Sequence, residues 1–286
     1  MKPDKRFLAL PKDFWAHVRL ISEHHGYTAR GTHQIKIPSL EDQIRSLDAL
    51  GMSTMKILDE SGGPSHFGQQ LGNYFVFRAN VLNNAVEPFL LDYPEAKALF
   101  NSVRRSLKSK IDIPMNKQKG KKKQPAFLTG MVNMIIHNRC KGQECDFDPR
   151  VLTRITRDKL PLRALARRVD GAFPSTLNPV AVWEIKEYYH TTTFGSRVAD
   201  GVYETLLDGM ELEELREKEA IDVRHYLFLD SHYTWWECGR SYLCRIVDML
   251  HMGYVDEVLF GKEIVKRLPE LVEEWLDILK EQPISS

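Results

Sequence analysis

Long hydrophobic runs are absent from this chain of 286 residues. A helix that crosses a bilayer needs about 20 mainly apolar residues, and no stretch of even about 18 occurs, so we expect no membrane-spanning segment. The opening residues, up to Trp15, are charged and hold too short an apolar stretch for a secretory leader. The expected location is therefore the cytoplasm.

Cysteine is scarce, with four residues at Cys140, Cys145, Cys238 and Cys244. In a chain without a secretory leader these are expected to be reduced thiols. His137, Cys140, Cys145 and one later cysteine could be combined into a zinc site, but their spacings are wider than those of the usual zinc knuckles. The pattern favours ordinary buried or unused thiols.

Net charge is also small, at +1, but it is unevenly distributed. Residues 1–150 hold 23 Lys and Arg against 15 Asp and Glu, whereas the remaining residues hold 17 against 24. A polyanion would therefore meet the first part and the middle of the chain. The hydrophobic fraction of 43% is ordinary for a globular protein of one large or two small domains.

Residues 1–125 are expected to form a mainly helical N-terminal region that could serve DNA recognition. Helical patterns cover residues 12–26, 39–51 and 69–90, and another begins at Pro94. Ser39 followed by Asp42 predicts a capping box at the second helix.

A lysine-rich arm at residues 107–124 holds seven lysines and little that could be buried. Such a segment is either a solvated linker or an arm that contacts phosphates, and the sequence leaves both open. In the second case the contacts come from Lys117, Lys119, Lys121, Lys122 and Lys123.

From residue 126 onwards strands alternate with helices, which predicts an α/β core of a mixed sheet flanked by helices over residues 126–286. The expected strands cover 164–173, 180–189, 223–230 and 255–260. The expected helices cover 126–138, 195–208, 238–251 and 262–281.

Three charged residues stand out in this core: Asp170, at the end of an apolar segment, and Glu184 and Lys186, inside an apolar strand. Side chains alternate along a strand, so Glu184 and Lys186 share one face about 6.6 Å apart, and Trp183 faces the other way. Charges in so apolar a strand need a partner or a function. Two carboxylates suit Mg²⁺, and a lysine could orient a water or stabilise negative charge, as phosphodiester hydrolysis requires.

A structural alternative exists, namely a cross-strand salt bridge on a half-exposed sheet. The pattern Glu-x-Lys is weak by itself, because it occurs a second time at Glu95–Lys97. That second copy follows Pro94, which marks a helix start rather than a strand. Only the copy at 184–186 has an upstream acid at a suitable distance.

Val169-Asp170, a 13-residue gap and Glu184-Ile185-Lys186 resemble the signature of the PD-(D/E)xK nuclease superfamily, which includes type II restriction endonucleases. Val169 stands where that family has proline. In the family a mixed sheet carries the acid–acid–lysine triad on a β-hairpin, and a further strand follows a crossing helix. The resemblance covers roughly residues 126–260.

The resemblance implies a restriction-endonuclease-like core with Asp170, Glu184 and Lys186 as catalytic residues, the two acids holding Mg²⁺, with Mn²⁺ as a substitute. It implies an endonuclease for double-stranded DNA, expected as a homodimeric, sequence-specific restriction enzyme with a cognate methyltransferase encoded nearby. The alternatives are a repair, recombination or phage-defence nuclease of the same fold, and a non-catalytic DNA-binding protein.

The turn before the helix at 195–208 carries Thr193, Ser196 and Arg197, which could hold a phosphate at the helix N-terminus or could be ordinary capping residues. An apolar stripe of Val198, Val202, Tyr203 and Leu206 is expected to bury this helix.

Members of the family often take a further acid from a helix before the first core strand. The helix at 126–138 offers Asn133 but no carboxylate, which leaves Glu41 and Glu87 as upstream candidates. Trp235 and Trp236 could stack on bases, but packing is favoured.

Overall fold

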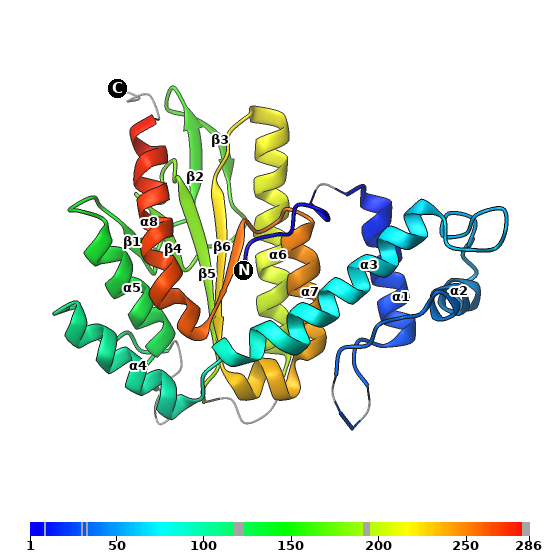
Figure 1. Cartoon of the computed structure of the whole chain (residues 1–286). Coiled ribbons are helices and arrows are strands. Elements are labelled where there is room, and N and C mark those ends of the chain that lie inside the picture. Colours follow the sequence, from blue (N-terminus) through cyan, green and yellow to red (C-terminus); the bar gives the residue numbers. More distant parts are fainter. Residues whose placement is uncertain are drawn as a thin grey trace.

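The structure is a computed structural model, and it describes residues 1–8, 10–29, 31–32, 34–116, 120, 123–190 and 195–281, with the backbone alone of Arg197. Its centre is a five-stranded sheet with helices on both faces (Figure 1). The strands of this sheet are β1 (Asp146–Phe147), β4 (Gly171–Phe173), β5 (Ala181–Glu187), β6 (Arg224–Asp230) and β7 (Glu257–Phe260), in that order.

Strand direction changes across the sheet. β1, β4 and β5 are antiparallel neighbours, whereas β5, β6 and β7 run parallel. The parallel connections need crossing helices, and α6 (Ser196–Glu219) and α7 (Arg240–His251) supply them. The prediction of a mixed α/β sheet flanked by helices is confirmed.

One face of the sheet is covered by α5 (Phe127–Arg139) and α8 (Ile264–Glu281), with α4 (Tyr93–Ser106) beside α5 (Figure 1). Trp183 of β5 points to this face and stacks on Trp275 of α8, with ring centroids 5.6 Å apart. This confirms that Trp183 faces away from Glu184 and Lys186.

The opposite face is covered by α6 and α7, which pack on Leu227, Leu229 and Val258 of the parallel strands. Trp235 and Trp236 are buried in the same cluster, so they pack in the core as favoured. They lie in a π-helical segment, His232–Cys238, between β6 and α7.

The N-terminal region is helical, as expected, with α1 (Lys12–His25), α2 (Leu40–Ala49) and α3 (His66–Val81). These helices share an aromatic core that includes Phe14, Trp15, Tyr74 and Phe75. The predicted capping box of Ser39 and Asp42 starts α2. Short turns follow α3 at Leu82–Val86 and Glu87–Phe89, and another, Gly261–Glu263, precedes α8.

The prediction of one strand over residues 164–173 is wrong. Residues Leu160–Ala164 form β3, which pairs with β2 (Arg154–Arg157) in a separate two-stranded hairpin. β4 begins only at Gly171, so residues 165–170 form a connecting segment and Asp170 precedes its strand instead of ending one. Residues 160–164 pair with the nearby strand β2, so they do not belong to the main sheet.

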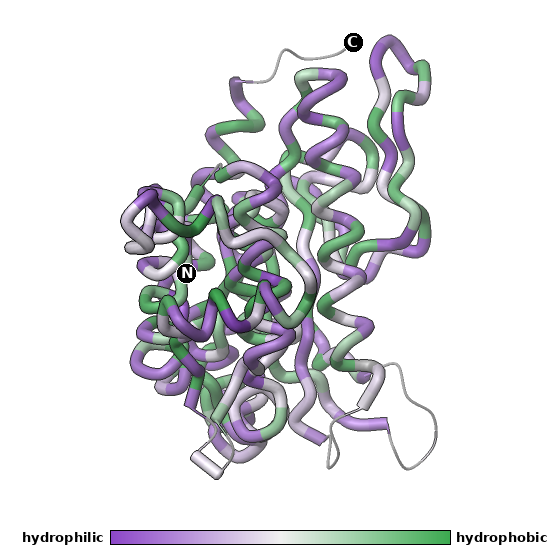
Figure 2. The backbone as a smooth tube through the Cα atoms, turned by 90° about the vertical axis from the view of Figure 1, so that its right-hand side faces the viewer, coloured by the Kyte–Doolittle hydropathy of each residue, from purple (hydrophilic) through white to green (hydrophobic). Residues whose placement is uncertain are grey.

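Hydrophobic and hydrophilic residues are intermingled along the coloured part of the backbone (Figure 2). Within the described residues, none of the helices has the length and apolar character that a bilayer crossing requires.

Candidate functional site

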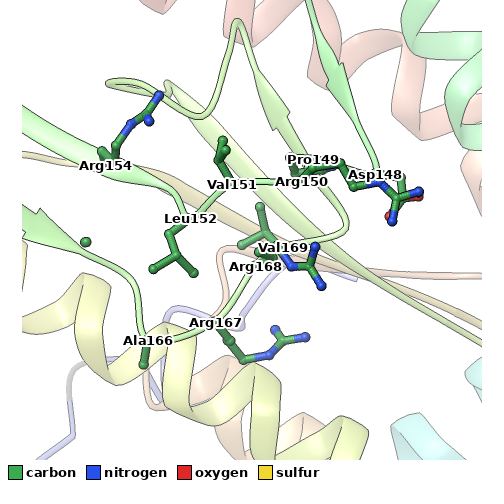
Figure 3. A pocket seen from close by; sticks show the side chains of 11 residues that line it. Asp148, Pro149, Arg150, Val151, Leu152, Arg154, Ala166, Arg167, Arg168 and Val169 are labelled. Atoms are coloured by element: carbon green, nitrogen blue, oxygen red, sulfur yellow. The ribbon is translucent and has the colours of Figure 1, made fainter.

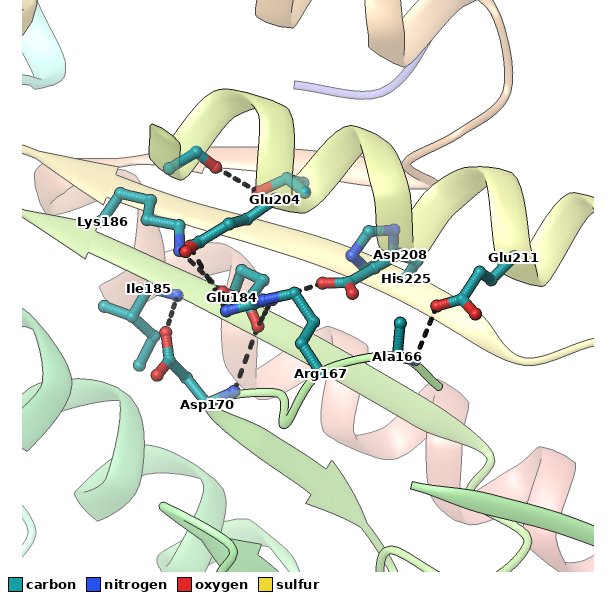
Figure 4. A network of polar contacts seen from close by, with 12 residues as sticks. Ala166, Arg167, Asp170, Glu184, Ile185, Lys186, Glu204, Asp208, Glu211 and His225 are labelled. Carbon is teal, nitrogen blue, oxygen red and sulfur yellow. Dashed lines mark hydrogen bonds and ion pairs between the residues drawn. The ribbon is translucent and has the colours of Figure 1, made fainter. Parts of the chain in front are cut away.

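The structure brings Asp170, Glu184 and Lys186 together on the face of β5 that α6 covers (Figure 4). The pairing of Gly171 with Trp183, continued by one residue, places Asp170 beside Glu184. The backbone N–H of Asp170 donates to Glu184 Oε1 at 3.2 Å, and Asp170 Oδ2 accepts from the N–H of Ile185 at 3.0 Å. Strand register thus holds both carboxylates at one point of the sheet.

Glu184 and Lys186 form a buried ion pair, with Lys186 Nζ 2.7 Å from Glu184 Oε2. Glu184 is fully buried and Lys186 is only 7% exposed. The pair is therefore not a salt bridge on a half-exposed sheet. Burial would raise the pKa of Glu184, but the charges of Lys186 and Arg167 outweigh it and hold that pKa below its usual value. Burial would likewise lower the pKa of Lys186, yet Glu184 and its neighbours hold it above the usual range, so both groups stay charged.

Arg167 is the second cation of this cluster, and it comes from the segment between β3 and β4. Its Nη1 lies 2.8 Å from Glu184 Oε1 and 2.6 Å from Asp208 Oδ2, and its Nη2 lies 3.3 Å from Glu204 Oε2. Glu204 also approaches Lys186 Nζ at 3.0 Å. One guanidinium therefore joins the sheet to α6 through three carboxylates (Figure 4).

Asp208 is fully buried, and its Oδ1 has no hydrogen-bond partner within the described part of the chain. Burial and the nearby charge of Glu184 raise the pKa of Asp208 to about 7, although Arg167 opposes the shift. A buried carboxylate oxygen without a partner is costly, which favours a proton or a further cation at this position.

Close packing of α6 on β5 positions the cluster. A Cβ added at Gly201 would lie 2.9 Å from Tyr188 Oη and 3.1 Å from Lys186 Cδ, so a larger residue here would displace the ends of these two side chains. The backbone of Lys186 is held as well, because Trp235 Nε1 donates to its carbonyl at 3.3 Å. The rotamer and the backbone of Lys186 are both constrained by these contacts.

The other face of the same strand end holds Glu187 and Asp230, which are paired in register between β5 and β6. Glu187 accepts from the N–H of Leu128 at 2.9 Å and from Thr129 Oγ1 at 2.6 Å, at the start of α5. Asp230 accepts from the N–H of Leu91 at 2.7 Å and from Tyr189 Oη at 2.6 Å. Burial raises the pKa of both carboxyls to about 7.

Several residues predicted to contact DNA cannot be placed. Lys117, Lys119, Lys121, Lys122 and Thr193 lie outside the described residues, as does the side chain of Arg197. Lys123 is exposed, and the bridge between Met115 and Pro125 closes the base of its segment. Ser196 is exposed in the first turn of α6, and it is Gly195, with no side-chain cap, that precedes the helix.

Glu204 and Asp208, the acids that α6 brings to the cluster, come from the helix between β5 and β6. The upstream candidates lie elsewhere: Glu41 is exposed on α2, and Glu87 lies 3.3 Å from His232. Tyr203 was expected in the apolar stripe of α6 but is 51% exposed, so that expectation is wrong. Its hydroxyl accepts a hydrogen bond from Arg245.

Arg167 and Asp208 are not among the residues predicted from the sequence, and Glu204 was not predicted to belong to the site. One signal was available: small and polar residues recur at helical spacing at Gly201, Thr205 and Asp208, ahead of Leu212 and Leu215. This second stripe faces the sheet, because Thr205, Asp208, Leu212 and Leu215 are all buried.

No group of three or more His, Cys, Asp or Glu side chains is arranged as a ready metal site within the residues that the structure describes. Cys140 is buried, and half-buried Cys145 donates through Sγ to the carbonyl of Ala172 at 3.6 Å.

The fold and the cluster define an α/β protein with buried acids, a lysine and an arginine on one face of a mixed sheet. The chain belongs to a family described as a domain of unknown function (DUF7687), which matches residues 91–275. Residues 1–85 match a second domain of unknown function (DUF7690). Neither a curated protein nor a solved structure matches the chain.

Proposed function

We propose that this chain is a metal-dependent nuclease that hydrolyses phosphodiester bonds of double-stranded DNA. The observation that carries the proposal is the convergence of Asp170, Glu184 and Lys186 at one point of the sheet. The burial of Glu184 and Lys186 strengthens it, since an ion pair inside a sheet contributes little net stability compared with apolar side chains. A chemical role explains why this strand carries charges that packing alone does not require.

The order of elements supports the same proposal. Helix α5 precedes the antiparallel strands β1, β4 and β5, then α6 crosses the sheet and β6 joins parallel to β5. This is the order implied by the resemblance to the PD-(D/E)xK nucleases, with the hairpin of β2 and β3 as an insertion between β1 and β4. The position of Asp170 just before β4 keeps the acid on the hairpin of β4 and β5.

The charge of the cluster favours a divalent cation. Four carboxylates surround two cations, which leaves a formal charge of −2 when all are ionised; these groups are Asp170, Glu184, Glu204, Asp208, Arg167 and Lys186. One divalent cation would balance that charge. Carboxylate oxygens are hard ligands of the kind that Mg²⁺ or Mn²⁺ prefers, and Asp208 Oδ1 still lacks a partner within the described residues. The donor set therefore fits such an ion.

Asp170 and Glu184 are the residues that would hold the ion. An ion of this kind polarises a phosphate oxygen and makes a bound water more acidic. Lys186 would donate hydrogen bonds to the attacking water or to the phosphate, whose negative charge increases in the transition state. Arg167 contacts Glu184 Oε1 at 2.8 Å, so its guanidinium would compete with an ion for that carboxylate.

Sequence-specific restriction by a homodimer, with a methyltransferase encoded nearby, remains our expectation for the biological role. The exposed lysine of the arm, Lys123, and the residues predicted at the start of α6 would then contact DNA backbone. A repair, recombination or phage-defence nuclease would use the same site with a different choice of DNA.

The decisive experiment incubates the protein with mixed genomic DNA and Mg²⁺ and sequences the fragment ends. We expect metal-dependent cleavage that Glu184→Gln abolishes. Discrete end sequences would indicate restriction, and ends linked to DNA structure or modification would indicate the repair or defence role. DNA binding without cleavage in Mg²⁺ or Mn²⁺ would overturn the proposal in favour of a non-catalytic DNA-binding protein.

A further inference from the structure

A cleft of about 770 Å³ opens beside the candidate site, between the segment 148–152 and residues 164–169 (Figure 3). Four arginines line it, at positions 150, 154, 167 and 168, against a single carboxylate, Asp148. Apolar side chains of Val151, Leu152 and Val169 lie between the arginines. The cleft is thus strongly basic and has apolar surface on its wall.

Two of these arginines are available to a ligand. Arg150 pairs with Asp148 at 3.0 Å, and Arg167 is held by the carboxylates of the candidate site. Arg154 and Arg168 are exposed, and no carboxylate pairs with either one within the described residues. Exposed guanidinium groups without an acidic partner match the planar, bidentate geometry of phosphate oxygens.

The wall of the cleft is a built framework. Val169 is buried with Ile155 of the hairpin and Leu212 of α6. The N–H of Ala166 donates to Glu211 Oε2 of α6 at 3.0 Å. Because the wall is tied to both the hairpin and α6, Arg154 and Arg168 extend from fixed backbone positions.

Arg167 joins the cleft to the candidate site, because it lines the first and contacts Glu184 of the second. A strand whose phosphate lay at Asp170, Glu184 and Lys186, and that continued past Arg167, would pass over the cleft. Successive phosphates follow every few ångströms along a strand, so neighbouring ones would meet the free arginines.

We propose that this cleft binds the nucleic-acid backbone adjoining the cleaved bond, with Arg154 and Arg168 contacting its phosphates. The assignment of nucleic acid as the ligand rests on the proposed function. The contacts are to the sugar–phosphate backbone, so they add affinity and fix the position of the strand without reading its sequence.

The test compares the double variant Arg154→Ala/Arg168→Ala with the parent chain in binding a 30-base-pair duplex. Ca²⁺ replaces Mg²⁺, and fluorescence anisotropy is measured over a series of salt concentrations. We expect the double variant to bind at least about tenfold more weakly at low salt. The slope of log affinity against log salt concentration should be shallower by an amount that corresponds to at most about two lost phosphate contacts. Both arginines are exposed and unpaired among the described residues, so the melting temperature should hardly change.

The matched control is Arg139→Ala/Lys266→Ala, which removes two exposed cations of α5 and α8 and should bind and cut as the parent does. Equal affinity and equal salt slope for the cleft variant and the parent would overturn the inference, even if the parent cuts DNA. A parent that binds DNA through these arginines but does not cut would support the cleft and overturn the nuclease. A parent that does not bind nucleic acid at all would overturn both.

Discussion

The two faces of strand β5 hold acids in opposite electrostatic settings. On the α6 face, Glu184 lies between the cations Lys186 and Arg167, and these hold its pKa below the usual value. On the α5 face, Glu187 and Asp230 receive hydrogen bonds from backbone N–H and hydroxyl groups, and burial raises the pKa of each to about 7. The acids on both faces are buried, so the difference between their pKa shifts comes from the groups that contact them.

This contrast distinguishes the ionised acids around Glu184 from Glu187 and Asp230, whose role is structural. A carboxylate that stays charged next to a lysine can exchange its cation for a metal ion or support chemistry on phosphate. A carboxyl that is partly protonated near neutrality and fully hydrogen-bonded mainly connects elements, as Glu187 connects β5 to the start of α5. Asp208 lies between these cases, because it contacts Arg167 and yet has a pKa of about 7.

Arg167→Ala should produce the largest change in stability, since it leaves Glu184 and Asp208 buried with one cation fewer. Removing one partner of a buried ion pair lowers the free energy of unfolding by on the order of 3 kcal/mol. Urea unfolding measures this loss directly. Adding Mg²⁺ should recover more stability in Arg167→Ala than in the parent, because the ion can replace the lost charge. Equal effects of Mg²⁺ on the two proteins would show that these acids do not bind the ion.

Glu184→Gln and Asp170→Asn should each lower the single-turnover cleavage rate by at least about 10²-fold, because each removes a charged oxygen ligand. The matched control is Glu187→Gln on the opposite face, whose amide can accept from the N–H of Leu128 through its oxygen and donate to Thr129 Oγ1 through its nitrogen. It should cut at nearly the parent rate. A site variant that keeps more than about a hundredth of the parent rate would place the chemistry elsewhere.

Lys186→Met should lower the single-turnover rate by roughly 10²-fold while DNA affinity in Ca²⁺ stays close to that of the parent. Asp170 and Glu184 remain to hold the ion, which explains the retained affinity. Because Lys186 is buried against Glu184, the variant should also lose stability whether or not the lysine is catalytic. The rate per folded molecule, measured well below the melting temperature, therefore decides between the two roles. An unchanged rate would assign Lys186 to structure alone.

Asp230→Asn should have the smallest effect on the cleavage rate, and its effect on stability should depend on pH. The carboxyl of Asp230 has a pKa of about 7 in the folded chain against an ordinary value of 3.8, so the folded state binds more protons between these values. The free energy of unfolding of the parent should therefore fall as pH rises from about 4 to about 7, by up to about 1.4 kcal/mol per pH unit. Denaturant titrations at several pH values should show a flatter profile for the variant. Asp158→Asn, at an exposed turn of the β2–β3 hairpin, should keep the profile of the parent. An unaltered profile in Asp230→Asn would place the pH dependence in other groups.

Local patterns predicted the parts of this protein that depend on near neighbours in the chain. The capping boxes at Ser39 and Asp92 start their helices, and the second one confirms that Glu95–Lys97 is a helix start. Alternation along one strand placed Glu184 and Lys186 together and Trp183 on the opposite face. These features follow from backbone geometry within a few residues, so the sequence by itself determines them.

Tertiary structure decided which groups surround that pair. Glu204 and Asp208 are well separated in the sequence from β5, and they join the cluster because α6 crosses the sheet there. Arg167 reaches Glu184 from the segment that precedes β4. Periodicity gives the direction of a side chain relative to its own helix or strand, but it does not say which element lies opposite. The exposure of Tyr203 and the burial of Asp208 on one helix were therefore settled by the packing of α6 against the sheet and against α7.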